Sequence, residues 1–413
     1  MTDTRTTTPA TPATAVAAPT DRPEDPTFRS LLRSFVRAES ATGIGFVQVV
    51  VGLAVIWTIF GVLNPNFLSA TNLTNLSLQI VAVAAIGMGV VLVLLLGEID
   101  LSVGSISGLG ATAMAALNIK LGVPPELAIL AALVGGALIG AIQGLIVATF
   151  GVPSFVVTLA GLIGWQGLQL FVFDYTGAMN VTDPQLLGLT GMFFQPWVGW
   201  LLLAVGLVMR AVLVLQVRRR RAAAELVNVR PWVEAVRFGL LAAILAVVIV
   251  MFAQDRGVPL AVLIVLALIM LMDFIARRTS FGRRIYAVGG DAQAAGRAGI
   301  HVARITVYVF MLSGVFGALG GVLSASRLQS VTQGAGSGDI LLDAIAAVVI
   351  GGTSLFGGRG SLWSALLGAL VIGSISNGMD LLALASPVKL MITGAVLITA
   401  VIFDASVRRK RSR

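Results

Sequence analysis

The sequence alternates long apolar segments with short polar connections. About 20 apolar residues, at a rise of 1.5 Å each, cross the roughly 30 Å hydrocarbon core of a bilayer. Because lipid cannot hydrogen-bond to the backbone, each such segment is predicted to be helical. Twelve approximate segments fit this pattern: 44–63, 77–96, 101–119, 127–148, 154–173, 197–216, 237–254, 258–276, 304–324, 339–355, 361–380 and 387–404.

These segments predict an all-α, polytopic membrane protein with 10–12 transmembrane helices. The tenth segment is short and rich in glycine, so it is predicted either as a full span or as a broken, re-entrant one. Residues 1–43 are predicted to form a disordered or amphipathic tail. Residues 44–404 are predicted to form the membrane domain, and residues 405–413 a basic tail.

The distribution of basic residues predicts the orientation, because cytoplasmic loops are enriched in Lys and Arg. With the N-terminus in the cytoplasm and strict alternation, 24 of the 28 basic residues fall on the inner side. The four on the outer side are Lys120, Arg256, Arg327 and Lys389. This asymmetry predicts that both termini are cytoplasmic.

Composition excludes several classes of function. Of the 413 residues, 57% are hydrophobic and 11% are charged, whereas soluble domains carry about 25% charged residues. This excludes a soluble enzyme and a nucleic-acid-binding domain. The absence of Cys, and a single His at 301, exclude disulfides and make a His-based metal centre implausible. The phosphate-binding pattern G-x-x-x-x-G-K-[ST] does not occur, so no ATP site or other cofactor is predicted.

Two predicted inner loops are long. Residues 217–236 contain the basic run Arg218–Arg221, which fits an orientation signal or a contact with anionic lipid. Residues 277–303 combine arginines, a Gly289–Gly290 turn and a short helix at Ala292–Arg297. Asp291 is placed to cap the start of that helix, and Gly299 to end it. A short capped helix in a cytoplasmic loop is a feature that a partner protein could hold.

Polar residues near the spans are the candidates for a translocation path. The sequence Gly97–Ser102 joins two apolar segments with no real loop. It is predicted either as a tight hairpin at the inner membrane edge, with Asp100 or Ser102 capping the next helix, or as a helix break that lines a path. The neutral polar residues fit interhelical hydrogen bonds or, as a set, a path for a neutral polyhydroxylated solute. The path candidates are Glu98, Asp100, Ser102, Gln79, Thr158, Gln166 and Asn377.

Four runs together resemble one known family. They are GEIDLSVGSISGLGA (97–111), GRRIYAVGGDAQAAGRAGI (282–300), AIAAVVIGGTSLFGGRGSLWSALLGAL (344–370) and NGMDLL (377–382). These runs resemble the monosaccharide permeases of ABC importers, the ribose, xylose, arabinose and galactose group. The resemblance covers about residues 44–185 and 258–404, and the longer stretch 186–257 is similar to the xylose-type branch.

The resemblance implies a multi-pass permease of the cytoplasmic (inner) membrane that imports a monosaccharide, with xylose favoured. It implies as partners an ABC ATPase that binds ATP, a periplasmic or lipoprotein sugar-binding protein, a second copy of the permease and membrane lipid. Residues of the ATPase-coupling segment are then Arg283, Arg284, Gly289, Gly290, Asp291, Ala295, Arg297 and Gly299. Asp291 departs from the family, which often has Asn there. The alternative is an ion-gradient-driven secondary sugar transporter, which would need carboxylates in mid-span.

Overall fold

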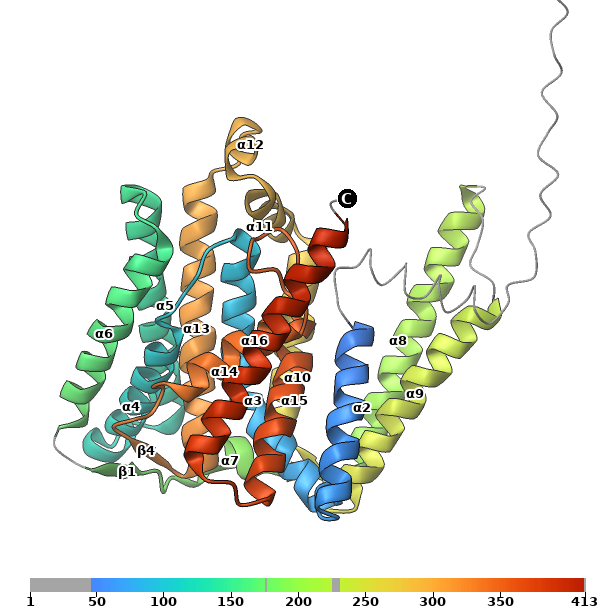
Figure 1. The fold of residues 1–413 in the computed structure, drawn as a ribbon, viewed down its shortest axis with the longest axis horizontal. Coiled ribbons are helices and arrows are strands. Elements are labelled where there is room, and N and C mark those ends of the chain that lie inside the picture. The colour runs from blue at the N-terminus through green and yellow to red at the C-terminus, as the bar shows by residue number, and fades with distance from the viewer. Residues whose placement is uncertain (1–45, 175–176, 225–230, 412–413) are drawn as a thin grey trace, which may run out of the picture. The chain divides into compact units, whose positions relative to one another are not determined.

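The computed structural model describes residues 46–174, 177–224 and 231–411, so the predicted tail at 1–43 lies outside the described residues. The described chain is mainly helical (Figure 1). Its helices are α2 Phe46–Leu63, α3 Ala70–Leu96, α4 Val103–Leu121, α5 Pro125–Phe150, α6 Ser154–Phe173, α7 Pro184–Gly191, α8 Pro196–Ala223, α9 Pro231–Ala253, α10 Leu260–Arg278, α11 Ser280–Gly290, α12 Ala292–Arg297, α13 Val302–Leu328, α14 Asp339–Ile350, α15 Trp363–Leu381 and α16 Ser386–Arg411.

Eight of the described helices are long and apolar enough to cross a membrane, which fits a polytopic membrane protein. They are α3, α5, α6, α8, α9 (as Glu234–Ala253), α10, α13 and α15. Each of the twelve predicted segments overlaps a helix, but not every helix is long and apolar enough to count as a span. The tenth segment is broken, because α14 has 12 residues and is about 18 Å long.

Helix α3 lies at the centre of the core. From Ile80 onward its sequence is apolar around the whole circumference, as expected of a helix that is covered on all sides. It packs against α10, α13, α14 and α15. By contrast, α8 and α9 lie side by side (Figure 1). Their apolar side chains, such as Val205 and Val247, are exposed. These exposed faces are suited to lipid rather than water.

Glycines allow α5 and α13 to pack with their backbones in contact. A Cβ at Gly136 would overlap the carbonyl oxygen of Gly314, and a Cβ at Gly140 would overlap that of Phe310. This is the close approach that small residues spaced four apart permit between membrane helices. A Cβ at the neighbouring Gly135 would meet no atom of another helix within 4 Å, so the close contact is confined to the Gly136–Gly140 face.

Two short antiparallel strand pairs add to the predicted all-α fold. Strand β1 (Ala178–Asn180) pairs with β4 (Ser330–Thr332), and β2 (Phe193–Phe194) pairs with β3 (Val258–Pro259). In Figure 1 the β1–β4 pair and α7 lie at the end of the long helices opposite α11 and α12. The β1–β4 pair therefore joins two connections at that end of the helices.

Two predicted connections and the predicted C-terminal tail are more helical than the sequence indicated. Much of the basic segment 217–236 is helical, because α8 continues through Arg218–Arg221 and α9 begins at residue 231. Most of 277–303 forms α11 and α12. Helix α16 continues to Arg411, beyond the predicted end of the last span at residue 404. Arginine and lysine have nearly as high a helix propensity as leucine, so a helix can continue from an apolar segment into a basic one. Hydropathy therefore marks where a helix becomes polar and not where it ends.

Candidate coupling and translocation site

The segment α11–α12 is built locally as a pair of capped helices. The Thr279 hydroxyl accepts a hydrogen bond from the Gly282 amide at the start of α11. The Asp291 carboxylate accepts one from the Ala294 amide at 2.8 Å, which confirms the predicted cap of α12. Gly299 has a φ of 84°, and the Ile300 amide donates to the Ala295 carbonyl, so the predicted glycine end is also confirmed.

The predicted Gly–Gly turn is wrong. Gly289 and Gly290 are the last two residues of α11, and the chain leaves the helix at Asp291, whose backbone is extended. A pair of glycines lowers helix propensity but does not forbid a helix whose other residues are fixed by packing. The turn comes one residue later, where the Asp291 side chain can cap the next helix.

The predicted coupling residues divide into an inward and an outward face. Gly289 is half-buried and Ala295 is buried, and both face the body of the protein. The others are exposed on the outward face: Arg283, Arg284, Gly290, Asp291, Arg297 and Gly299. The segment is therefore docked by its small and apolar side and presents a mainly basic side outward.

Helix α11 is docked on two interruptions of the membrane helices. One is the turn after α3, where Gly97 has a φ of 82°, and the other is the segment between α14 and α15. A Cβ at Gly289 would overlap the carbonyl oxygen of Leu95 and lie 2.8 Å from the amide nitrogen of Gly358. That amide donates to Leu95 at 3.0 Å, so the two interruptions are joined directly beneath Gly289.

A second contact fixes α11 to the same segment. The Tyr286 hydroxyl donates to the Gly360 carbonyl at 2.9 Å. Burial raises the pKa of Tyr286, so this hydroxyl keeps its proton at neutral pH. The neighbouring Ser361 accepts from Arg277, whose guanidinium also pairs with Asp273 at 2.8 Å. Sequence reasoning missed Tyr286 and the Gly357–Gly360 segment, because their role depends on which segments meet in space.

The predicted path residues near Gly97 form a buried hydrogen-bond network. Asp100 accepts from the Ser102 amide and hydroxyl at 2.9 and 2.6 Å, and from the Ser313 hydroxyl at 2.8 Å. The Ser102 hydroxyl is also 2.9 Å from the Gln143 side-chain oxygen. Thr158 donates to the Ile99 carbonyl at 3.2 Å. Asp100 thus fixes the start of α4 from a buried position, and the interpretation as a helix break that lines a path stays a prediction.

A separate polar group joins α3 to α15. The Asn377 side chain accepts from Asn72 at 2.8 Å and donates to Gln79 at 3.2 Å. Gln79 and Asn377 are thus brought together by interhelical hydrogen bonds, the alternative that the sequence left open. Glu98 is half-buried in the turn after α3, and Gln166 is half-buried on α6, outside both networks. A role for any of these side chains in lining a path stays a prediction.

The geometry is thus a docked helical segment over two joined helix interruptions, in a bundle of apolar helices. Residues 72–401 match the family described as branched-chain amino acid transport system / permease component. The chain belongs to this permease family. A permease of such a system is a membrane transport subunit rather than an enzyme, and it acts with an ATPase and a substrate-binding protein.

Relatives of this permease carry names of sugar transport systems. The chain is 37% identical over 365 residues to the xylose transport system permease protein XylH of Escherichia coli (strain K12), covering 88% of this chain and 92% of that protein. It is 34% identical over 364 residues to the ribose import permease protein RbsC of Bacillus subtilis (strain 168), covering 87% and 92%. XylH of Haemophilus influenzae is 34% identical over 368 residues. No solved structure matches the chain.

Proposed function

We propose that this chain is the membrane-spanning permease subunit of an ABC importer for a monosaccharide, with a pentose such as xylose as the favoured substrate. The observation that carries the proposal is the docking of α11 on the joined interruptions after α3 and α14. A cytoplasmic ATPase that moves α11 would move the Leu95 and Gly358 backbones with it. Hydrolysis on another chain would thereby shift the ends of two membrane helices.

The outward face of α11–α12 supports an ATPase groove as the partner surface. Arg283, Arg284 and Arg297 are exposed there beside a helix of 6 residues that is capped at both ends. A short capped helix transmits force with little internal deformation, because its backbone bonds are satisfied locally. The partner groove is expected to be acidic.

The proposed assembly contains two copies of this chain in the cytoplasmic membrane. Both termini lie in the cytoplasm, and up to twelve segments contact the bilayer, in agreement with the 24 to 4 distribution of basic residues. Lipid covers apolar faces such as those of α8 and α9. An extracytoplasmic sugar-binding protein delivers substrate to the opposite end of the bundle.

The substrate class rests on the relatives. Those named above are permeases for xylose and ribose, whereas the family description names branched-chain amino acids. The xylose and ribose permeases match over 88% and 87% of this chain, so the proposal follows them rather than the family description.

Reconstitution in liposomes tests this function. The permease, its ATPase and its binding protein are expected to import radiolabelled D-xylose only when ATP is supplied on the cytoplasmic side. The permease alone is expected to import none under a proton or sodium gradient. Gradient-driven uptake by the permease alone would refute the proposal in favour of a secondary transporter. Import of L-leucine in place of D-xylose would refute the substrate class.

A further inference from the structure

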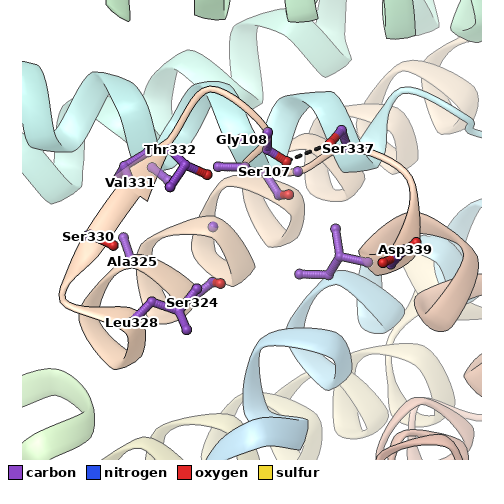
Figure 2. A pocket seen from close by; sticks show the side chains of 16 residues that line it. Ser107, Gly108, Ser324, Ala325, Leu328, Ser330, Val331, Thr332, Ser337 and Asp339 are labelled. Atoms are coloured by element: carbon purple, nitrogen blue, oxygen red, sulfur yellow. Dashed lines mark hydrogen bonds between the residues drawn. The ribbon is translucent and has the colours of Figure 1, made fainter. Parts of the chain in front are cut away.

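A cavity of about 260 Å³ lies between α4, α13, β4 and the segment 333–340 (Figure 2). Its wall on α13 begins at Gly321. Nineteen residues of helix separate Val302 from Gly321, so the cavity is about 29 Å along α13 from the coupling segment. It therefore lies toward the end of the bundle where an extracytoplasmic partner would deliver substrate.

Hydroxyl groups and one carboxylate line this cavity. Figure 2 shows Ser107 on α4, Ser324 on α13 and Asp339 at the start of α14, which are brought together from three separate elements. The Ser107 hydroxyl already donates to the Gly104 carbonyl at 2.7 Å, and Ser337 donates to Gly334 at 2.6 Å. Their oxygens keep lone pairs that can accept hydrogen bonds from a ligand.

A glycine-rich segment forms one wall. The Gln169 side chain, which is fully buried on α6, donates to the Ala335 carbonyl at 3.0 Å and holds this segment in place. Gly336 has a φ of 76°, and a Cβ there would overlap Gly104 and Gly108 of α4. The segment therefore lies close against α4, and its position sets the width of the cavity.

We propose that this cavity is a transit site for a pentose, with Asp339 accepting hydrogen bonds from two sugar hydroxyls. The proposal rests on the proposed function and names where the sugar enters the permease. A carboxylate with neighbouring hydroxyls offers acceptors to a polyol, which presents a donor at almost every carbon. Asp339 is exposed at the cavity, so its side-chain oxygens are accessible to a ligand.

The lining also indicates weak binding. None of the 16 residues drawn around the cavity is aromatic, so no ring is available to stack on the sugar face. A pentose has about ten non-hydrogen atoms, and an ordinary binding efficiency per atom gives a Kd of roughly 1–10 mM. Weak binding suits a transit site, because a tightly held sugar would not move on.

The test measures binding to the full-length permease in lipid nanodiscs by saturation-transfer NMR, with D-xylose and L-leucine as probes. The wild type is expected to bind D-xylose with a millimolar Kd and to give no signal with L-leucine. Asp339→Asn is expected to weaken D-xylose binding about tenfold, because a charged acceptor is lost. Ser324→Leu, which fills the cavity, is expected to abolish it.

Glu126→Gln is the matched control, since Glu126 is also an exposed acid in the first turn of a helix, α5, and is not among the residues lining the cavity. It is expected to bind as the wild type does. Equal binding by Asp339→Asn, Glu126→Gln and the wild type would overturn the inference, as would a preference for L-leucine. ATP-driven uptake is measured separately in liposomes. If ATP-driven uptake is observed but the cavity variants change neither binding nor uptake, the transit site alone is refuted. If D-xylose binds in the cavity but no ATP-driven uptake is observed, the proposed function alone is refuted.

Discussion

Gly289→Ala tests whether the close approach of α11 to the helix interruptions couples ATP hydrolysis to transport. The added Cβ would overlap the Leu95 carbonyl oxygen and lie 2.8 Å from the Gly358 amide, two groups that hydrogen-bond to each other at 3.0 Å. Overpacking costs about 1–3 kcal/mol, and a lost buried hydrogen bond about 1 kcal/mol. Alanine returns up to about 1 kcal/mol through its higher helix propensity.

The net cost is about 1–3 kcal/mol, which corresponds to a 5- to 150-fold loss in the population of the docked arrangement. Gly290→Ala is the matched control. It adds the same methyl group one residue further along, where no atom beyond its own helix and its chain neighbours lies within 4 Å. This change is expected to be neutral or slightly stabilising, because only the propensity gain remains.

The assay is ATP hydrolysis and sugar uptake by the complete transporter in liposomes, with co-purification of the ATPase as a check on assembly. Gly289→Ala is expected to retain the ATPase, because the outward face of α11 is unchanged, and to lose about tenfold or more of its uptake per ATP hydrolysed. Gly290→Ala is expected to match the wild type. Equal coupling in the two variants would refute the reasoning, because the two changes differ only in what the new methyl group meets.

Three further outcomes are expected. Asp291→Ala removes the cap of α12 and should cost about 1 kcal/mol, seen as faster hydrogen exchange confined to α12; unchanged exchange would contradict it. Asn377→Leu leaves the Asn72 and Gln79 amides short of a partner and should lower thermal stability by about 1–2 kcal/mol, whereas the Asn72→Leu and Asn377→Leu double variant should regain part of this loss. Burial raises the pKa of Asp255, but hydrogen bonds from Arg256 and Thr71 outweigh this effect and lower the pKa below its ordinary value of 3.8. These hydrogen bonds therefore stabilise the folded protein above pH 3.8, and their contribution is lost as the pH falls through the lowered pKa. The melting temperatures of the wild type and of Asp255→Asn, measured at decreasing pH, should converge in this pH range. A difference in melting temperature that stays constant with pH would refute the prediction.

Features that depend on local chemistry could be predicted from the sequence. The cap at Asp291 and the end at Gly299 follow from residues within a few positions of each other, and both are confirmed. Apolar length likewise located the eight described helices that are able to cross a membrane, since each helix needs only its own backbone to satisfy its hydrogen bonds. The interruption at Gly97 was visible as a polar break, but its neighbour at Gly357 was not linked to it.

Features that depend on long-range contacts could not be predicted in this way. Gly289 has no unusual φ, so nothing local requires a glycine there; the requirement comes from the backbone of Leu95, far away in the sequence. Asn377 was recognised as polar, but its partner Asn72 lies 305 residues away. The cavity at Ser107 and Ser324 was missed because small residues on two helices look the same whether they pack together or leave a space.

Helix α13 offers a physical connection between the two ends of the protein. Its first residue, Val302, follows shortly after α12, the proposed coupling helix, and its last turns line the cavity at Ser107 and Ser324. Between them it packs on α5 with close backbone contacts at Gly136 and Gly140. Interlocked side chains would resist sliding, because each ridge must leave its groove. Glycine contacts present a smoother surface, so a displacement imposed at α12 can be carried along α13 as a rigid body. A weak transit site at the far end would then be opened or narrowed by the same movement that follows ATP hydrolysis.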